Sequence, residues 1–439
     1  MLFSFLRYVK PTWYFNLRPK QDYAYFPSQE QLLQNSISFE KDLGYQSAEA
    51  CERDLAWTAF QRGVIQSKPE AGLNVWNTPK LPLADEYRFL RKNVHVAWVV
   101  YTLLLRVLTF HNPFAEFAAF WKTRHVSRFD YANQALPYSA YDSFESPLLA
   151  ERPFVSVVIP TLNRYSYLKD VLRDLERQTY THFEVLLVDQ SEPFDATFYE
   201  GWNLDLHFWY QKEKALWKAR NEAIQKAKGS YILLYDDDSL VDPDWIEHHL
   251  KTLDFFQADL SSGVSLSVVG AEIPKHYRYF RWSDQLDTGN VLLKKSVFES
   301  IGYFDLQFEK QRMGDGEYGL RCYLNGFKNI SNCKAKRIHL KVSEGGLRQM
   351  GSWDGWRPKK LLGPRPVPSV LYLSRKYFGA ALSRYYILQS ILPSLVPYRL
   401  KKNKFLLFLS FVFIPLLLPL VLFQVFKSWR MSSKMLAAV

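Results

Sequence analysis

The chain of 439 residues has few cysteines and lacks features that define several classes of protein. Its three cysteines, Cys51, Cys322 and Cys333, have neither metal-ligand nor redox spacing. We therefore expect free thiols in a reducing compartment. The apolar stretch 2–6 is too short for a signal peptide, so export is not expected. Internal repeats and low-complexity tracts are also absent from the sequence.

Long hydrophobic runs are rare as well, and one stands out. Residues 405–426 include no charged side chain. As a helix rising about 1.5 Å per residue, they would reach about 33 Å, enough for the hydrocarbon core of a bilayer. Pro415 and Pro419 would kink that helix. A membrane span, a kinked hairpin, an interfacial segment and a buried helix all remain open from the sequence.

Positive charge is concentrated just before this run. Residues 331–404 hold sixteen lysines and arginines against two acids, a net charge of +14 in a chain whose total is +12. Such a segment beside a hydrophobic run is attracted to anionic lipid on the cytoplasmic leaflet. Nucleic acid is the competing partner, but no recognisable nucleic-acid module accompanies the charge. Apolar residues at helical spacing favour a segment resting on the membrane surface; they are Val370, Leu373, Tyr377, Ala381, Tyr385, Leu388 and Leu392.

The most informative segment is 230–239, where an apolar run ends in three acids. Tyr231 to Tyr235 is predicted to be a buried strand, and Asp236, Asp237 and Asp238 follow it. Like charges at this spacing repel strongly unless something neutralises them. A divalent cation with a diphosphate is the simplest solution, because Mn2+ and Mg2+ prefer carboxylate oxygens and bridge phosphates. A solvated acidic turn before a helix is the alternative.

Strands and helices alternate around this segment. Phe154 to Pro160 and Phe183 to Val188 are apolar runs typical of buried parallel strands, and a helix is predicted from about Trp217 to Lys228. This alternation predicts an α/β fold with right-handed crossovers and a mostly parallel sheet flanked by helices. Ligands of such sheets bind at the carboxyl ends of the strands. Polar residues stand at those ends in this chain: Thr161, Asn163, Arg164, Asp189, Asp236, Asp237 and Asp238.

Six short motifs together resemble the inverting glycosyltransferases of family 2, which have the nucleotide-diphospho-sugar-binding fold called GT-A. They follow the family's order between about Phe154 and Lys341. The motifs are Val157-Val-Ile-Pro-Thr-Leu-Asn-Arg164, Val188-Asp-Gln-Ser191, Ala219-Arg-Asn-Glu-Ala-Ile224, Asp236-Asp-Asp238, Thr288-Gly-Asn290 and Asp315-Gly-Glu-Tyr-Gly-Leu-Arg321. Each motif is weak alone, and the set in order is specific.

The resemblance implies a nucleotide-diphospho-sugar donor, with a UDP-sugar expected. The loop from Pro160 to Arg164 and Asp189 would hold the base and ribose, and Arg220 would lie near the phosphates. The residues that we assign to the donor on this basis are Pro160, Thr161, Asn163, Arg164, Asp189, Arg220, Asp236 and Asp237.

The resemblance also implies a metal site for Mn2+ or Mg2+. Asp236 and Asp238 would form the family's Asp-x-Asp motif at the ribose and the metal. His339 follows a strand-like stretch and is the candidate third ligand, because imidazole suits Mn2+. A structural histidine is the alternative.

Asp315 is the candidate general base. It aligns with the family's Glu-Asp motif when Arg321 is the anchor, and a carboxylate there would accept the proton of the acceptor hydroxyl. Gly314 stands where that motif has its Glu, a departure from the family pattern. Glu317 is the second candidate, to bind the acceptor or share the proton. Acids favoured by a helix N-terminus are the alternative for both.

An aromatic run is the candidate acceptor platform. It comprises Tyr277, Tyr279, Phe280 and Trp282, and Thr288-Gly-Asn290 follows it. We predict acceptor contacts for Trp282, Gly289 and Asn290. Core packing explains the aromatic residues equally well.

The domain organisation that we predict has five parts. Residues 1–150 form a helical N-terminal extension of unassigned role, with helices at 47–66 and 85–110, and 151–345 form the glycosyltransferase domain. Residues 346–404 are a basic amphipathic membrane-proximal segment. A hydrophobic membrane segment, 405–426, and a short basic tail, 427–439, follow.

These features predict a membrane-associated inverting glycosyltransferase. It would transfer a sugar to a lipid-linked or polysaccharide acceptor in cell-envelope glycan synthesis. The catalytic domain would lie on the cytoplasmic side of the cell membrane, against an anionic surface and without nucleic acid. A processive synthase is disfavoured, because residues 349–353 depart from its Gln-x-x-Arg-Trp motif. A catalytically inactive membrane scaffold of the same fold is the alternative, and Gly314 is the feature that favours it.

Overall fold

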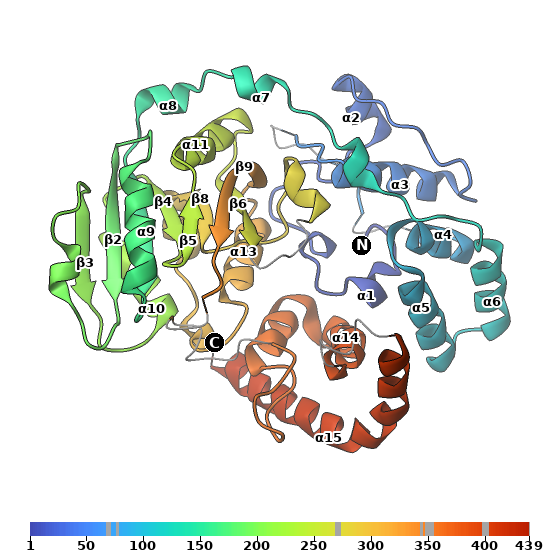
Figure 1. Ribbon diagram of the computed structural model, residues 1–439. Coiled ribbons are helices and arrows are strands. Elements are labelled where there is room, and N and C mark those ends of the chain that lie inside the picture. Colours follow the sequence, from blue (N-terminus) through green and yellow to red (C-terminus); the bar gives the residue numbers. More distant parts are fainter. Residues whose placement is uncertain are drawn as a thin grey trace.

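The computed structural model of the chain is built around one mixed sheet of nine strands. It describes residues 1–66, 72–75, 79–267, 274–342, 346, 355–396 and 404–438, without the side chains of 404–415. The strands are β1 (Val155–Thr161), β2 (Phe183–Asp189), β3 (Leu206–Tyr210), β4 (Tyr231–Tyr235), β5 (Ser239–Val241), β6 (Leu260–Ser267), β7 (Arg281–Trp282), β8 (Asn290–Lys294) and β9 (Asn329–His339). Figure 1 shows the sheet with helices on its faces.

Helices lie between the strands in the sequence, and further helices precede the first strand and follow the last one. Between and after the strands lie η3 (Ala196–Tyr199), η4 (Lys275–Arg278), η5 (Leu306–Phe308), α9 (Tyr165–Glu176), α10 (Leu216–Lys226), α11 (Trp245–Phe255), α12 (Lys295–Ile301) and α13 (Gly314–Leu324). The N-terminal region contains α1 (Leu6–Val9), η1 (Tyr14–Asn16), α2 (Gln29–Gln34), α3 (Ala48–Gln61), α4 (Leu83–Asn93), α5 (Val96–Leu108), α6 (Pro113–Lys122), η2 (Tyr131–Gln134), α7 (Ala140–Ser143) and α8 (Pro147–Glu151). The C-terminal region contains α14 (Pro368–Leu395) and α15 (Lys404–Ala437).

The sheet is mixed, so the prediction of a mostly parallel sheet holds for only part of it. The strand order is β3-β2-β1-β4-β8-β6-β9-β5, with β7 beside β9. Strands β3, β2, β1 and β4 are parallel, as expected from the alternating helices, but β8 is antiparallel to both β4 and β6. In the second half of the sheet, β6 and β9 are parallel to each other, whereas β5 and β7 are antiparallel to β9. An apolar run of five residues has the same composition in either direction, so the sequence could not indicate the reversal.

The buried strands themselves are confirmed. Every residue of β1 and β2 is buried, because helices cover both faces of the parallel half. The predicted strand 231–235 coincides with β4, and the helix predicted from Trp217 to Lys228 is α10. Leu168, Val171, Leu172 and Leu175 form the buried face of α9.

The helix predicted at 85–110 is two helices. The backbone of Val94 and His95 is extended, which separates α4 from α5. The His95 side chain accepts a hydrogen bond from the Ala97 amide and caps α5. Neither glycine nor proline marks this break in the sequence.

The N-terminal region packs against the sheet domain and α14. Tyr14 donates a short hydrogen bond to the carbonyl of Gly316 in α13, and Trp13 Nε1 donates to Asp284 Oδ2 at 3.1 Å. The Tyr8 and Tyr385 rings meet edge to face at 5.1 Å. This extension is therefore part of the same body (Figure 1).

The C-terminal helices correct one expectation. Val370, Leu373 and Tyr372 in the first half of α14 are buried, and the Tyr372 hydroxyl donates to Asp305 at 2.8 Å. That apolar face packs on the protein, whereas Leu388 and Leu392 further along are exposed. Within the described residues, we find no helix with both the length and the apolar character needed to cross a bilayer. The predicted hydrophobic segment 405–426 falls in α15, with the side chains of 405–415 outside the described part.

A buried lysine joins the extension to the sheet domain and yields a testable prediction. Lys328 Nζ donates to the carbonyls of Gln66 and Phe256, and burial lowers its pKa to about 7. Between about pH 7 and 10 the unfolded lysine is protonated and the folded one is not, so unfolding takes up a proton and stability rises with pH. One proton corresponds to a slope of at most about 1.4 kcal/mol per pH unit. Unfolding at pH 7, 8 and 9 should show this slope reduced in Lys328→Met.

The matched control is Lys334→Met in β9, the strand that begins just after Lys328, because the Lys334 ammonium pairs with Asp142 at the surface. We expect Lys334→Met to keep the slope of the wild type. Equal slopes in wild type and Lys328→Met would mean that Lys328 stays charged in the folded protein.

Candidate active site

A cavity lies at the carboxyl ends of β1 and β4, where the sequence predicts the site. Its volume is about 170 Å³. The residues that line it are Pro160, Arg164, Lys214, Leu216, Trp217, Arg220, Asp236, Asp237, Asp238, Thr288, 309–313, Asp315, His339, Lys341 and Val342. Asp236, Asp237 and Asp238 follow β4 in the parallel half of the sheet. Residues 309–313, just before α13, complete the lining.

The three predicted metal ligands come together in this cavity. One ligand atom from each of Asp236, Asp238 and His339 lies within 4.8 Å of the others, and His339 Nε2 is 3.4 Å from Asp238 Oδ1. The pairing of β5 with β9 places Ser239 opposite His339, which brings the histidine beside the acids. Two carboxylates and one imidazole are a donor set that suits Mn2+, and the carboxylates suit Mg2+. The residues therefore fit a divalent cation.

Asp236 is held between two buried arginines. Arg220 Nη2 donates to Asp236 Oδ1 at 2.9 Å, and Arg337 Nη1 donates to Oδ2 at 2.8 Å. Arg337 also binds both oxygens of Asp287, at 2.9 and 2.7 Å. Burial lowers the pKa of Arg337, but the charges of Asp287 and Asp236 outweigh it and raise this pKa above its usual value. The arginines fix the orientation of the carboxylate.

Arg337 and Asp287 were missed in the sequence. Arg337 lies among the sixteen cations that we assigned to lipid binding, and the structure buries it in the site. Its place on β9, two residues before His339, was the available signal, since residues two apart on a strand share a face. At least this part of the basic segment serves the cavity and not a membrane surface.

Asp237 and Asp238 share Arg164 as a partner but have opposite pKa shifts. Asp237 accepts from Thr161 Oγ1 and Arg164 Nη1, both at 2.8 Å, and burial raises its pKa to about 6 against the effect of Arg164. Burial also raises the pKa of Asp238, but His339 and Arg164 outweigh it and hold this pKa below its usual value. Thr161, predicted as a donor ligand, is buried and joins the tips of β1 and β4.

Asp189 and Asn163 form a second group beside the cavity. Asp189 is fully buried and accepts hydrogen bonds from Tyr165 (2.6 Å), Tyr199 (2.7 Å) and the Ser191 amide (2.8 Å). Asn163 is exposed at φ 53°, and its Oδ1 accepts from the Glu192 amide at 2.9 Å. Neither residue lines the cavity. The Asp189 oxygens thus have protein partners in this conformation.

The two candidate bases in α13, Asp315 and Glu317, have different surroundings. Asp315 lines the cavity at the start of the helix. Glu317 is buried, pairs with Arg321 at 3.0 Å and accepts a short hydrogen bond from the Tyr377 hydroxyl. Glu317 therefore fixes α13 to α14, and its predicted contact with an acceptor does not occur in this arrangement.

Packing explains why residue 314 is a glycine. A Cβ atom on Gly314 would lie 2.4 Å from atoms of the Trp217 indole, which donates to the Phe308 carbonyl at 3.1 Å. No side chain fits there without displacement of Trp217. The glycine that replaces the family's Glu is thus matched to a tryptophan on α10.

The predicted acceptor residues lie elsewhere. Trp282 is buried, with its ring 4.6 Å from that of Tyr25. Asn290 is fully buried and accepts from Trp245 and His249. Only Gly289 lies near the acids, since a Cβ there would be 2.2 Å from Asp236 Oδ2. Of the aromatic run, Phe280 and Trp282 pack in the core, as the alternative held, whereas Tyr277 and Tyr279 are half-buried.

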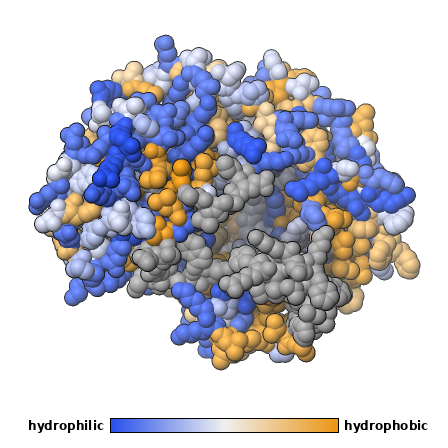
Figure 2. Space-filling view, viewed as in Figure 1, coloured by the Kyte–Doolittle hydropathy of each residue, from blue (hydrophilic) through white to orange (hydrophobic). Residues whose placement is uncertain are grey.

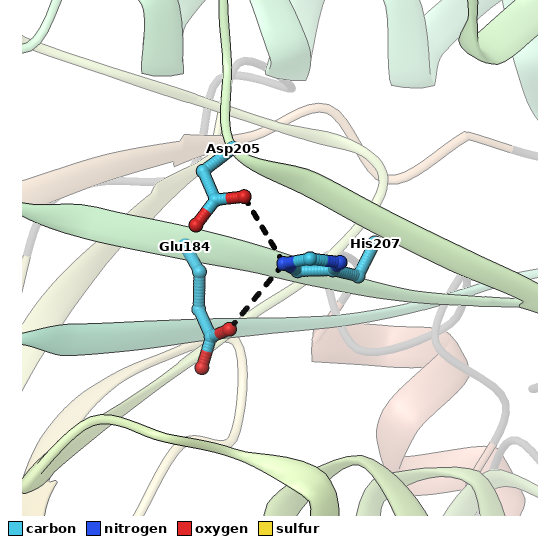
Figure 3. Close-up of side chains that lie close together, drawn as sticks. All are labelled: Glu184, Asp205 and His207. Carbon is cyan, nitrogen blue, oxygen red and sulfur yellow. Dashed lines mark ion pairs between the residues drawn. The ribbon is translucent and has the colours of Figure 1, made fainter.

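A second acidic group lies at the opposite end of the sheet. His207 Nε2 is 3.0 Å from Asp205 Oδ1 and 3.7 Å from Glu184 Oε2. Figure 3 shows the His207 ring between the two carboxylates. The other oxygen of Glu184 accepts from Ser156 Oγ at 2.6 Å and the Lys228 amide at 2.7 Å. Because these residues stand at the starts of β2 and β3, the group joins strands and takes no part in the cavity.

Comparison with known proteins identifies relatives of the sheet domain. Residues 156–310 match the family described as Glycosyl transferase family 2. A PGL/p-HBAD biosynthesis glycosyltransferase of Mycobacterium bovis is 27% identical over 190 residues, 39% of this chain and 71% of the relative. The putative glycosyltransferase EpsH of Bacillus subtilis is 28% identical over 220 residues, 44% of this chain and 62% of the relative. A structure of S. aureus TarS with UDP-GlcNAc aligns with a TM-score of 0.42 at 17% identity, over 65% of this chain and 91% of that chain.

The contact between Gly314 and Trp217 predicts a position-specific loss of stability. Gly314→Ala should lower the free energy of unfolding by about 1–3 kcal/mol, the usual cost of overpacking. Gly316→Ala is the matched control two residues on, where the nearest atom to a new Cβ is Met313 Cε at 3.4 Å. We expect Gly316→Ala to stay within about 1 kcal/mol of the wild type. Urea unfolding measures both, and equal losses would contradict the contact.

Proposed function

Because residues 156–310 form a glycosyltransferase family 2 domain, we propose that the chain is a membrane-associated inverting glycosyltransferase of the GT-A type. It transfers a sugar from a nucleotide-diphospho-sugar, with UDP as the expected nucleotide, to a lipid-linked or polysaccharide acceptor. The observation that supports this most is the convergence of Asp236, Asp238, His339 and Asp315 on one cavity.

The donor end of the cavity suits a diphosphate and a divalent cation. Asp236, Asp238 and His339 would hold Mn2+ or Mg2+, and the bound cation would stabilise the negative charge that grows on the leaving diphosphate. Arg220 and Arg337 pair with the Asp236 carboxylate and orient it. Lys341 and Lys214 add positive charge to the lining. The side chains therefore balance the charges of acids, cation and phosphates.

Asp315 is the proposed general base. Its place in the first turn of α13 brings a carboxylate to the cavity wall, on an element separate from the metal ligands. Attack by an acceptor hydroxyl on the anomeric carbon, with departure of the diphosphate, inverts the configuration there. The hydroxyl proton passes to Asp315 as the new bond forms.

The proposed acceptor and location rest on relatives and on sequence. The named roles of relatives include PGL/p-HBAD biosynthesis in Mycobacterium bovis and O-antigen biosynthesis in Myxococcus xanthus, the latter a match over 20% of that relative. We propose an acceptor in cell-envelope glycan synthesis on this basis. The basic segment and the uncharged run 405–426 would hold the enzyme on the cytoplasmic leaflet, where nucleotide sugars and lipid-linked acceptors meet.

The inactive scaffold is the weaker proposal. It was favoured by Gly314, and the contact with Trp217 explains that residue by packing. An intact set of acids, histidine and arginines in one cavity has no role in a scaffold.

The metal assignment predicts metal-dependent donor chemistry. With Mn2+ or Mg2+, purified protein should hydrolyse a UDP-sugar or transfer the sugar from it. A chelator should abolish this activity. Asp238→Asn, which keeps the shape and removes the charge, should abolish metal-dependent donor binding in calorimetry while unfolding as the wild type does. Unchanged donor affinity at saturating Mn2+ would refute the assignment. GDP- and dTDP-sugars in the same screen identify the nucleotide.

The base assignment predicts a loss confined to the chemical step. Asp315→Asn should lower transfer by about two to four orders of magnitude, the usual effect of removing a general base, with donor affinity nearly unchanged. Glu317→Gln is the comparison, because it alters a buried pair and should lower thermal stability with a smaller effect on turnover. Near-normal turnover in Asp315→Asn together with a large loss in Glu317→Gln would move the role to Glu317.

A further inference from the structure

The outer face of α5 is apolar and exposed to solvent. Val96, Val100, Leu104 and Leu108 recur every fourth residue, so they form one stripe along the helix. Their exposed fractions run from 38% at Val100 to 75% at Leu108. A surface helix of a soluble domain normally places polar residues on this face.

The turn after α5 and the helix α6 continue the same surface. Phe110 is 98% exposed and Phe114 is 84% exposed, and Phe117 and Trp121 are exposed further along α6. Phe114, Phe117 and Trp121 lie at helical spacing on one face of α6. We call this set of exposed apolar residues on α5 and α6 the hairpin surface.

The hairpin itself is firmly packed on its inner side. Val99 and Leu103 of α5 are buried, and so is Ala119 of α6. Arg106 of α5 pairs with Glu116 of α6 at 2.6 Å, and Tyr87 donates to the same carboxylate at 2.7 Å. The exposed apolar face therefore belongs to a hairpin whose opposite side is packed against the rest of the protein.

Charge along the α5–α6 segment is mostly positive. Glu116 is the only acid between positions 94 and 129, and it is 2% exposed and neutralised by Arg106. Lys122 at the end of α6 and Arg124 after it are exposed, and Asp130, the next acid along the chain, pairs with Lys275. Exposed aromatic residues beside Lys122 and Arg124 match the interface of an anionic bilayer, where apolar rings enter the headgroup boundary and cations meet lipid phosphates.

We propose that the α5–α6 hairpin is a membrane-docking element that inserts into a leaflet containing anionic lipid. This inference rests on the proposed membrane association and assigns part of it to the N-terminal extension. Figure 2 shows hydrophobic residues gathered over α5 and α6 and again over α15 at the lower side of the same face. Leu416, Leu422 and Phe426 of α15 are exposed there. The enzyme thus meets the bilayer through two separate regions of the chain.

The test is flotation of full-length protein with vesicles of phosphatidylcholine, with and without phosphatidylglycerol. Phe110→Glu combined with Phe114→Glu should weaken binding by about tenfold or more for each phenylalanine, because burial of the rings is lost. Lys122→Ala combined with Arg124→Ala should weaken binding only to vesicles that contain phosphatidylglycerol. Leu43→Glu is the matched control, since Leu43 is an apolar residue 85% exposed between α2 and α3, and should bind as the wild type does.

Three other outcomes would overturn the inference. Equal flotation of wild type and the phenylalanine variant would leave membrane association to α15 alone. No flotation of the wild type would refute membrane association altogether, while the nucleotide-sugar assays would still report on the transferase itself. A dimer that becomes monomeric in the phenylalanine variant, with vesicle binding unchanged, would make the hairpin surface an interface between copies.

Discussion

Three consecutive carboxylates at the end of a buried strand are the constraint around which the site is built. Asp236, Asp237 and Asp238 can coexist there because arginines reach them from separate elements. Arg164 contacts Asp237 and Asp238, while Arg220 and Arg337 hold Asp236. These cations come from the start of α9, from α10 and from β9, so β1, α10 and β9 must all be in place before the acids are stabilised.

The sequence predicted the parts of the site that follow directly from strands. The acids of β4 and the Pro160 to Arg164 loop lie at the tips of neighbouring parallel strands, and an apolar run ending in polar residues is enough to find them. His339 was found through resemblance to a family and lies with the acids. Partners that are distant in the sequence could not be predicted in this way. Asp287 and Arg337 are fifty residues apart and meet only because β8 is antiparallel to β4 and β9 lies beyond β6, which no local pattern reveals.

Three of the predicted site residues share one physical property in the structure. Glu317, Trp282 and Asn290 have polar or aromatic side chains that suit a sugar site, and each is satisfied inside the protein. Glu317 meets Arg321 and Tyr377, and Asn290 meets Trp245 and His249. Composition indicates what a side chain is able to bind, but only packing decides whether it faces a ligand or a neighbour. The same holds for Arg337, whose charge we had attributed to lipid.

Helix α13 is braced by segments that lie far from it on both sides in the chain. Tyr14 binds the carbonyl of Gly316 from the N-terminal extension, and Tyr377 of α14 binds Glu317 sixty residues downstream. During synthesis, the strands and their acids emerge from the ribosome well before Tyr377 does. The helix that holds Asp315 therefore reaches its final packing late, after Asp236, Asp237 and Asp238 have emerged. Order of emergence thus separates assembly of the two halves of the cavity.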